Sequence, residues 1–244
     1  MTAGYPRFRA VLFDLPGTVL RTEDNVEAHL RLMESFVERY GLPDEPAFLL
    51  EKFNARIFEP YERLDRGWVS HRDTVAAVLG GFLRSHKREV SPSDEEWFQE
   101  AYLEKHQSLV RLVPGAADLL ARCSEMKLHL AAVGNMDRGY LEKQLGWLSV
   151  LERFDSLTTP EEAGAPLPDE RMLRMALQRA GARPEQAIFV GASVERGIRP
   201  ARGLGLETVL LDTAMNQTAI AGADFVASSV GRVENIIIEL VYRP

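Results

Sequence analysis

The sequence predicts an α/β fold in which a parallel sheet forms the core and an all-helical subdomain is inserted into it. Short, continuously apolar runs that suit buried strands, such as Val11–Phe13 and Ala187–Val190, alternate with amphipathic stretches of helical length. This alternation is typical of a parallel sheet covered on both faces. Residues 21–107 instead keep a helical period with no strand-like run. The expected domains are therefore a core of residues 1–20 and 108–244 and a helical insertion of residues 21–107.

The insertion is expected to hold four helices. In the first of them, apolar side chains recur at helical spacing (Val26, Leu30, Met33, Val37 and Tyr40) before Gly41-Leu42-Pro43 ends the run. The other three are expected at residues 46–58, 70–86 and 93–107. Ser70 with Asp73, and Ser93 with Glu96, have the spacing of a helix N-cap and a carboxylate three residues later.

The remaining elements follow the order expected for a parallel sheet with helical crossovers. They are helix 114–126, strand 128–133, helix 138–148, strand 154–157, helix 169–180, strand 187–190, helix 195–203, strands 207–211 and 225–227, and helix 231–241.

Composition narrows the function classes. The 244 residues carry 29 Lys and Arg against 36 Asp and Glu, a formal charge of −7, which disfavours nucleic acid or an anionic membrane as a partner. A single cysteine, Cys123, permits no internal disulfide and is typical of a reducing compartment. No apolar run approaches the ~20 residues of a membrane span, and the N-terminal segment lacks the apolar stretch of a secretory signal. These features predict a cytoplasmic protein.

Four short motifs follow predicted strand ends in chain order. They are Asp14-Leu15-Pro16-Gly17-Thr18, Gly134-Asn135, Ala165-Pro166-Leu167-Pro168-Asp169 and Gly191-Ala192-Ser193-Val194-Glu195-Arg196-Gly197. Together with the helical insertion after the first strand, they resemble the haloacid dehalogenase (HAD) superfamily, and most of all its phosphoglycolate phosphatase and β-phosphoglucomutase branch. The resemblance extends over the whole chain. It implies a Rossmann-like core with hydrolase chemistry at the strand ends and a helical cap over it.

The resemblance also implies a role for each motif position. Asp14 stands where the family has its nucleophile, but Pro16 occupies the position of the acid/base aspartate and has no side chain that transfers a proton. Gly134 occupies the position of a Ser or Thr hydroxyl, and Ala165 that of the lysine that neutralises the phosphate. Ala192 and Gly197 occupy the positions of carboxylates that hold Mg²⁺, so we expect Mg²⁺ binding to be lost or weak and no cofactor to be required.

These substitutions favour a pseudoenzyme, a HAD-like protein that has lost phosphatase activity and binds an unknown small molecule or protein partner in the cleft between cap and core. Two alternatives remain: a working hydrolase with Asp14 as nucleophile, acting on a small phosphoester or without metal, and a structural or assembly subunit. The residues that could still line a ligand or anion pocket are Gly17, Thr18, Asn135, Ser193 and Arg196.

Arg196 and the histidines carry two further expectations. With the lysine and metal gone, a guanidinium on the fourth motif could form a forked ion pair with Asp14. The alternative, and the more usual place for an arginine, is in solvent. The five histidines, at positions 29, 71, 86, 106 and 129, lack the spacing of metal ligands and are expected to be surface or packing residues.

Overall fold

The computed structural model describes residues 7–21, 25–57, 68–213 and 222–242. The chain divides into two compact units, one formed by Met1–Arg21 with Arg111–Pro244 and the other by Thr22–Val110. Here they are called the core unit and the helical unit.

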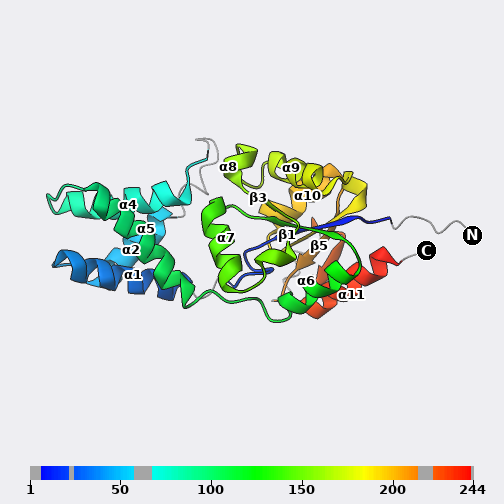
Figure 1. Cartoon of the computed structure of the whole chain (residues 1–244), viewed down its shortest axis with the longest axis horizontal. Coiled ribbons are helices and arrows are strands. Elements are labelled where there is room, and N and C mark those ends of the chain that lie inside the picture. The colour runs from blue at the N-terminus through cyan, green and yellow to red at the C-terminus, as the bar shows by residue number, and fades with distance from the viewer. Residues whose placement is uncertain (1–6, 22–24, 58–67, 214–221, 243–244) are drawn as a thin grey trace, which may run out of the picture. The chain divides into compact units, whose positions relative to one another are not determined.

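The core unit is built on a six-stranded sheet whose strands are all parallel (Figure 1). The order across the sheet is β3-β2-β1-β4-β5-β6. The strands are β1 (Ala10–Asp14), β2 (His129–Val133), β3 (Ser156–Thr158), β4 (Ala187–Gly191), β5 (Glu207–Leu211) and β6 (Phe225–Ala227). The predicted α/β fold with a parallel sheet is confirmed.

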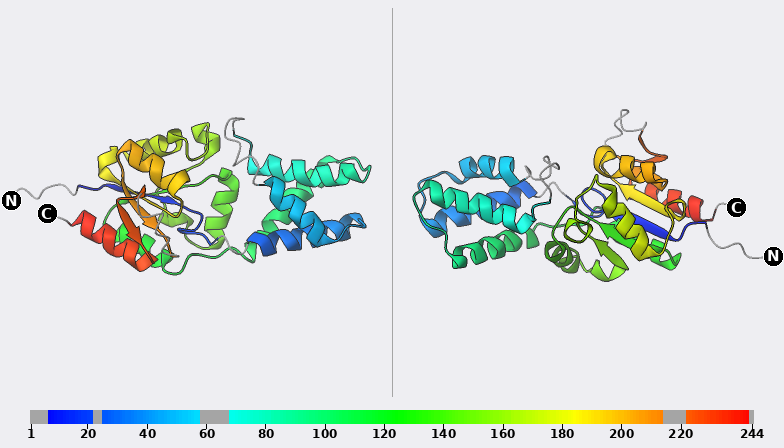
Figure 2. Two further views of the ribbon diagram at one scale, coloured as in Figure 1. Left: turned by 180° about the vertical axis from the view of Figure 1, so that it is seen from behind. Right: turned by 90° about the horizontal axis from the view of Figure 1, so that it is seen from above.

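Helices cover both faces of this sheet (Figure 1 and Figure 2). One layer contains α8 (Pro160–Ala163), α9 (Glu170–Ala180) and α10 (Arg199–Leu204), and the other contains α6 (Ala116–Glu125) and α11 (Val230–Val241). The remaining elements are α7 (Arg138–Trp147), the 3₁₀ turns η2 (Leu151–Arg153) and η3 (Pro184–Gln186), and the π-helical turn η4 (Val194–Ile198). Every residue of β1 and β4 is buried, which explains why these strands read as unbroken apolar runs.

The described residues of the helical unit form four helices and no strand. Its helices are α1 (Asn25–Tyr40), α2 (Pro46–Ile57), α4 (His71–Ser85) and α5 (Pro92–Gln107). α1 packs against α2 and α5, and α4 packs against the same two helices. Residue 58, the expected end of the second helix, lies outside the described residues.

The first expected helix is confirmed as α1, whose buried residues are Ala28, His29, Leu32, Met33 and Phe36, whereas Val26 is 57% exposed. One local prediction in the helical unit was wrong. The N-cap of α5 is Ser91 rather than Ser93. Pro92 occupies the first turn, where its missing N–H costs nothing, and Ser91 forms a capping box with Asp94. The predicted cap at Ser70 is confirmed, because its Oγ accepts a hydrogen bond from the N–H of Asp73 at 2.9 Å.

None of the described helices is both long and apolar enough to cross a membrane.

Candidate functional site

The carboxyl end of β1 is the natural starting point for a site in this sheet. Asp14 pairs in register with Val133 of β2, and Phe13 pairs with Val190 of β4, so the ends of three strands meet around Asp14. The chain builds the sheet outward from β1 in two directions, β2 and β3 on one side and β4 to β6 on the other. Ligands of open α/β sheets bind at the carboxyl edge where the strand order reverses in this way. Asp14 occupies that position.

Asp14 is a buried carboxyl with little compensating charge. It is 6% exposed, and burial raises its pKa to about 7. The charge of Arg196 and a hydrogen bond from the backbone N–H of Leu15 both act in the opposite direction and lower this pKa. The carboxyl is therefore neutral at mildly acidic pH and only partly ionised near neutrality.

The loop after β1 forms a tight turn that begins beside this carboxyl. The carbonyl of Leu15 accepts hydrogen bonds from Val19 and Leu20 at 2.9 and 2.8 Å. Gly17 has φ of 74°, the left-handed region that favours glycine. A Cβ on Gly17 would lie 3.1 Å from Cβ of Ala192, so this loop and the loop after β4 are packed against each other.

Thr18 lies inside this loop rather than on its surface. The residue is 1% exposed, and among the described residues its Oγ1 has no hydrogen-bond partner. The hydroxyl is therefore a buried group under the loop in this structure.

Hydrocarbon surrounds the position expected to hold a hydroxyl after β2. A Cβ on Gly134 would lie 3.5 Å from Cδ1 of Leu15 and 3.9 Å from Cδ2 of Leu141, which is ordinary van der Waals contact. A Cβ at Gly134 would therefore meet hydrocarbon from these two leucines. Leu15 and Leu141 line the site, and the sequence reasoning did not identify them.

Asn135 positions the third motif. Its Nδ2 donates to the carbonyl of Leu167 at 2.8 Å, and its Oδ1 accepts from the N–H of Leu167 at 2.7 Å. The Leu167–Pro168 peptide bond is cis. Both amide atoms of Asn135 are thus engaged by backbone, which assigns it to holding this loop beside β2. Ala165 in the same loop is 5% exposed and presents a buried methyl group where the family lysine would stand.

Gly197 brings the fourth motif against Asp14. A Cβ on Gly197 would lie 3.6 Å from Oδ2 of Asp14 but only 2.8 Å from both Cε1 and Cζ of Phe189. A side chain cannot enter here unless the ring or the backbone shifts, because contacts this short do not occur between carbon atoms. The ring of Phe189 is fully buried. It occupies the space through which a carboxylate at position 197 would approach Asp14.

Of the two expectations for Arg196, the exposed position is confirmed and the ion pair with Asp14 is not. No ion pair joins the two residues within the described part of the chain; Nε of Arg196 lies 3.5 Å from Oγ of Ser193 instead. Ser193 caps η4 by accepting from the N–H of Arg196 at 3.3 Å, and the arginine stays exposed. The guanidinium thus keeps its hydration, while its charge is still near enough to lower the pKa of Asp14.

The donor set at this edge does not suit Mg²⁺. Across residues 7–21, 25–57, 68–213 and 222–242, no three His, Cys, Asp or Glu side chains are grouped so that they could hold a metal ion. Mg²⁺ requires near-octahedral oxygen coordination, and Ala192 and Gly197 offer no side-chain oxygen. The residues around Asp14 therefore do not fit the metal that the fold family uses.

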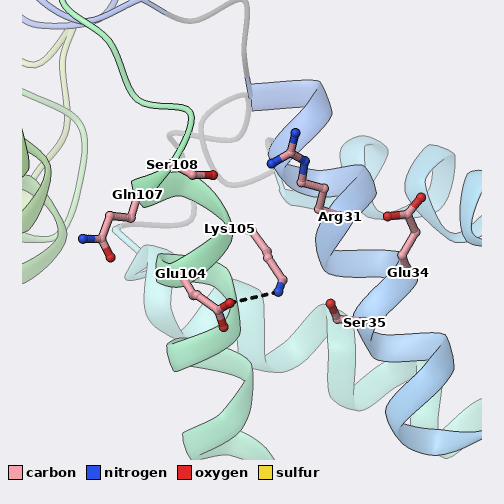
Figure 3. A pocket seen from close by; sticks show the side chains of 7 residues that line it. All are labelled: Arg31, Glu34, Ser35, Glu104, Lys105, Gln107 and Ser108. Carbon is pink, nitrogen blue, oxygen red and sulfur yellow. Dashed lines mark hydrogen bonds and ion pairs between the residues drawn. The ribbon is translucent and has the colours of Figure 1, made fainter.

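A groove of about 670 Å³ lies in the helical unit, between α1 and α5 (Figure 3). Its lining residues are Arg31, Glu34, Ser35, Glu104, Lys105, Gln107 and Ser108. The cations in it are already paired, Lys105 with Glu104 at 3.1 Å and Arg31 with Glu27 at 2.8 Å. The groove is thus polar and of mixed charge.

The class of protein is defined by comparison of the whole chain with known families. The model of a family described as haloacid dehalogenase-like hydrolase matches residues 8–205. The chain is also 30% identical over 208 residues to the human haloacid dehalogenase-like hydrolase domain-containing protein 3, covering 79% of this chain and 81% of that protein. The chain belongs to the haloacid dehalogenase-like hydrolase family.

Individual members of this family give more specific likenesses. N-acetylmuramic acid 6-phosphate phosphatase of Pseudomonas aeruginosa is 30% identical over 204 residues, which cover 83% of this chain and 80% of that protein. Among solved structures, a HAD phosphatase from Thermococcus onnurineus superposes with a TM-score of 0.73, covering 94% of this chain and 98% of that one at 19% identity. The structural likeness supports the fold.

Proposed function

We propose that this HAD-family protein does not transfer phosphoryl groups and instead binds, around Asp14, a ligand that is not a phosphate dianion. The observation that carries the proposal is the packing of Phe189 against Gly197 beside the Asp14 carboxyl. The ring fills the space that a metal-binding side chain at position 197 would need. Replacing Gly197 alone by a carboxylate residue would therefore not restore the metal site.

Electrostatics supports the same conclusion. Phosphoryl transfer depends on positive charge placed around the transferring group. The cation that acts on Asp14 is Arg196, which is exposed and not in contact with it. A dianion ~4 Å from the ionised carboxylate would be repelled by roughly 4 kcal/mol per charge pair at an effective dielectric constant of about 20. Below pH 7 the carboxyl is increasingly protonated and loses its nucleophilicity, so neither protonation state favours attack on a phosphate.

A second candidate is an active hydrolase that uses Asp14 as nucleophile. It is favoured by the phosphatase activity named for the Pseudomonas relative and by the aspartate retained at the end of β1. Such an enzyme would need the ionised carboxylate as its nucleophile. Because the pKa of Asp14 is about 7, its rate would rise as pH increases through 7.

A phosphatase assay separates the two candidates. The full chain is incubated with excess Mg²⁺ and a panel of sugar phosphates beside the Pseudomonas phosphatase as a positive control. We expect no Mg²⁺-dependent turnover. Turnover near ~1 s⁻¹, the low end of ordinary enzymes, that disappears in Asp14→Asn would contradict the proposal and favour the hydrolase.

Thermal stability gives an independent readout of binding. Inorganic phosphate with Mg²⁺ is expected to leave the melting temperature unchanged, since only a ligand bound by the native state raises it. A screen of uncharged and cationic small molecules should raise it, with the response reduced in Asp14→Asn. A rise with phosphate and Mg²⁺ would contradict the proposed selectivity.

A further inference from the structure

Three of the five histidines meet in the interior of the helical unit. His29 of α1, His71 of α4 and His106 of α5 are 2%, 4% and 5% exposed. The ring centroids of His29 and His106 are 5.3 Å apart, and the ring of Tyr102 lies 4.1 Å from His106 and 4.9 Å from His71. These three histidines are called the histidine cluster below. The cluster joins three helices that are far apart in sequence.

Hydrogen bonds fix the tautomers of two of these rings. Nδ1 of His106 donates to the carbonyl of Tyr102 at 2.7 Å, because a carbonyl can only accept. Nδ1 of His29 lies 2.6 Å from Oδ1 of Asn54, which likewise accepts. In both neutral rings the proton is therefore on Nδ1, and a second proton would have to be added at Nε2. For His106 this atom is buried and has no hydrogen-bond partner among the described residues.

The surroundings of the cluster oppose that second proton. Burial lowers the pKa of all three imidazoles, to about 3 for His71 and about 4 for His106. Positive charge on His106 and His29 lowers the pKa of His71 further. From α2, the groups that face His29 are Phe53 and Asn54, which are uncharged.

The charged neighbours on α1 and α5 do not offset this effect. Lys105, next to His106 in sequence, is paired with Glu104 and lines the groove shown in Figure 3. Arg31 lines the same groove and is paired with Glu27. Arg31, Glu104 and Lys105 line the groove, whereas the histidines of the cluster are buried.

We propose that the histidine cluster is an acid-sensitive lock that keeps the helical unit closed while its imidazoles are neutral and opens it when they take up protons. While neutral, the three rings pack around the ring of Tyr102, and His29 and His106 keep their hydrogen bonds through Nδ1. Protonation places like charges about 5 Å apart in a buried space, and moving the rings into water relieves both the repulsion and the loss of hydration. Because the rings come from α1, α4 and α5, their departure separates these helices. The inference is independent of the function proposed for Asp14.

Hydrogen–deuterium exchange on the full chain tests this lock. Between about pH 7.5 and about pH 5, after correction for the intrinsic rate, amides of α1, α4 and α5 should lose at least about tenfold of their protection, while β1 and β4 of the core unit keep theirs. His71→Phe replaces a titrating ring with an apolar one and should reduce the loss. Unchanged protection of the helical unit in the wild-type chain at about pH 5 would overturn the proposal.

His86 provides the matched control. It lies in the same unit, but its Nε2 is 2.6 Å from Oδ2 of Asp44, and its side chain is 24% exposed. Its ring already has a carboxylate partner, so His86→Gln should leave the acid response of α1, α4 and α5 as it is. An acid response abolished by His86→Gln but kept in His71→Phe would assign the effect to the surface pair and overturn the lock.

NMR titration of the histidine rings requires no variant to fold. The lock predicts that none of the three cluster rings takes up a proton while the helical unit remains closed, so their signals should change together with the loss of protection. A cluster histidine that titrates near its ordinary pKa of about 6.5 in a unit that remains protected would also overturn the proposal.

Discussion

The two units of this protein both bury ionisable side chains, but the buried groups have opposite chemistry. In the core unit, burial raises the pKa of the acid Asp14 to about 7. In the helical unit, burial lowers the pKa of three bases, reaching about 3 for His71. In both places the interior stabilises the neutral form of the group, because desolvation penalises charge of either sign. The comparison shows that one physical cause gives the two units opposite responses to acid.

The direction of each response follows from the folded and unfolded pKa values. For Asp14 the folded value lies above 3.8, so its contribution to stability is fully present below 3.8 and is lost as pH rises toward 7. For the cluster histidines the folded values lie below 6.5, so their contribution is fully present above 6.5 and is lost as pH falls toward 3 to 4. Between these limits, acid stabilises the site in the core unit and destabilises the helical unit.

The largest expected effect comes from removing the acid at β1. Asp14→Asn keeps the shape of the side chain but cannot ionise. The shift from 3.8 to about 7 corresponds to about 4 kcal/mol, so the wild-type chain should lose about that much unfolding free energy relative to the variant between pH 4 and pH 8. Urea unfolding of both proteins across this range measures the difference. A constant difference would show that Asp14 is not the buried titrating group of the core.

The next effect tests the anchoring of the histidine cluster at neutral pH. Asn54→Ala removes the oxygen 2.6 Å from Nδ1 of His29 and leaves a buried donor, which should cost about 2 kcal/mol of unfolding free energy. Glu51→Ala on the same helix changes an exposed residue and should cost less than about 0.5 kcal/mol. Chemical denaturation followed in the helical unit compares them. Equal effects would indicate that the hydrogen bond to His29 does not stabilise the cluster.

A pair of glycines tests the packing beside Asp14. Gly197→Ala introduces a Cβ 2.8 Å from the ring of Phe189 and should destabilise the core by about 1–2 kcal/mol through overpacking. Gly203→Ala, in α10, meets nothing within 4 Å and should be neutral or stabilising by up to about 1 kcal/mol. Urea titrations of the two variants and the wild-type chain measure the change in unfolding free energy that each substitution causes. If Gly197→Ala is as stable as Gly203→Ala, the aromatic ring does not block the approach to Asp14.

The smallest effect on stability is expected for Arg196→Ala. The exposed arginine makes no ion pair with Asp14, so its loss should change the unfolding free energy by less than about 0.5 kcal/mol. It should nevertheless raise the pKa of Asp14 further, since the arginine charge lowers it in the wild-type chain. NMR titration of the carboxyl group measures this change. A fall in that pKa, or a large loss of stability, would contradict the geometry described for Arg196.

The sequence predicted most of the core fold because its signals are local. Unbroken apolar runs at β1 and β4 identify strands buried on both faces, and the motif after β1 identifies Asp14 before any tertiary contact is known. The helical spacing of Val26, Leu30, Met33 and Val37 predicted α1 but not which of its faces is buried. Packing with α2 and α5 selects that face, which includes Met33 and also His29.

The contacts around the site could not be predicted, because they depend on side chains brought together by the fold. Phe189 lies two residues before Gly191 and eight before Gly197, and nothing in that spacing reveals that its ring covers the latter. The histidine cluster is a stronger case. Positions 29, 71 and 106 have no ligand-like spacing, and only the arrangement of α1, α4 and α5 makes them neighbours. They were expected to be surface or packing residues, and all three are buried packing residues, but their convergence was missed.

The most direct test of the account is a titration of the Asp14 carboxyl carbon by ¹³C NMR, with and without excess Mg²⁺. A buried carboxyl without a metal site should titrate with a pKa of about 7, and Mg²⁺ should leave the curve unchanged. A pKa near 3.8 would show that burial does not hold Asp14 in its neutral form, and a marked fall of the pKa on addition of Mg²⁺ would show that a metal site remains beside it. Either result would contradict the proposed function.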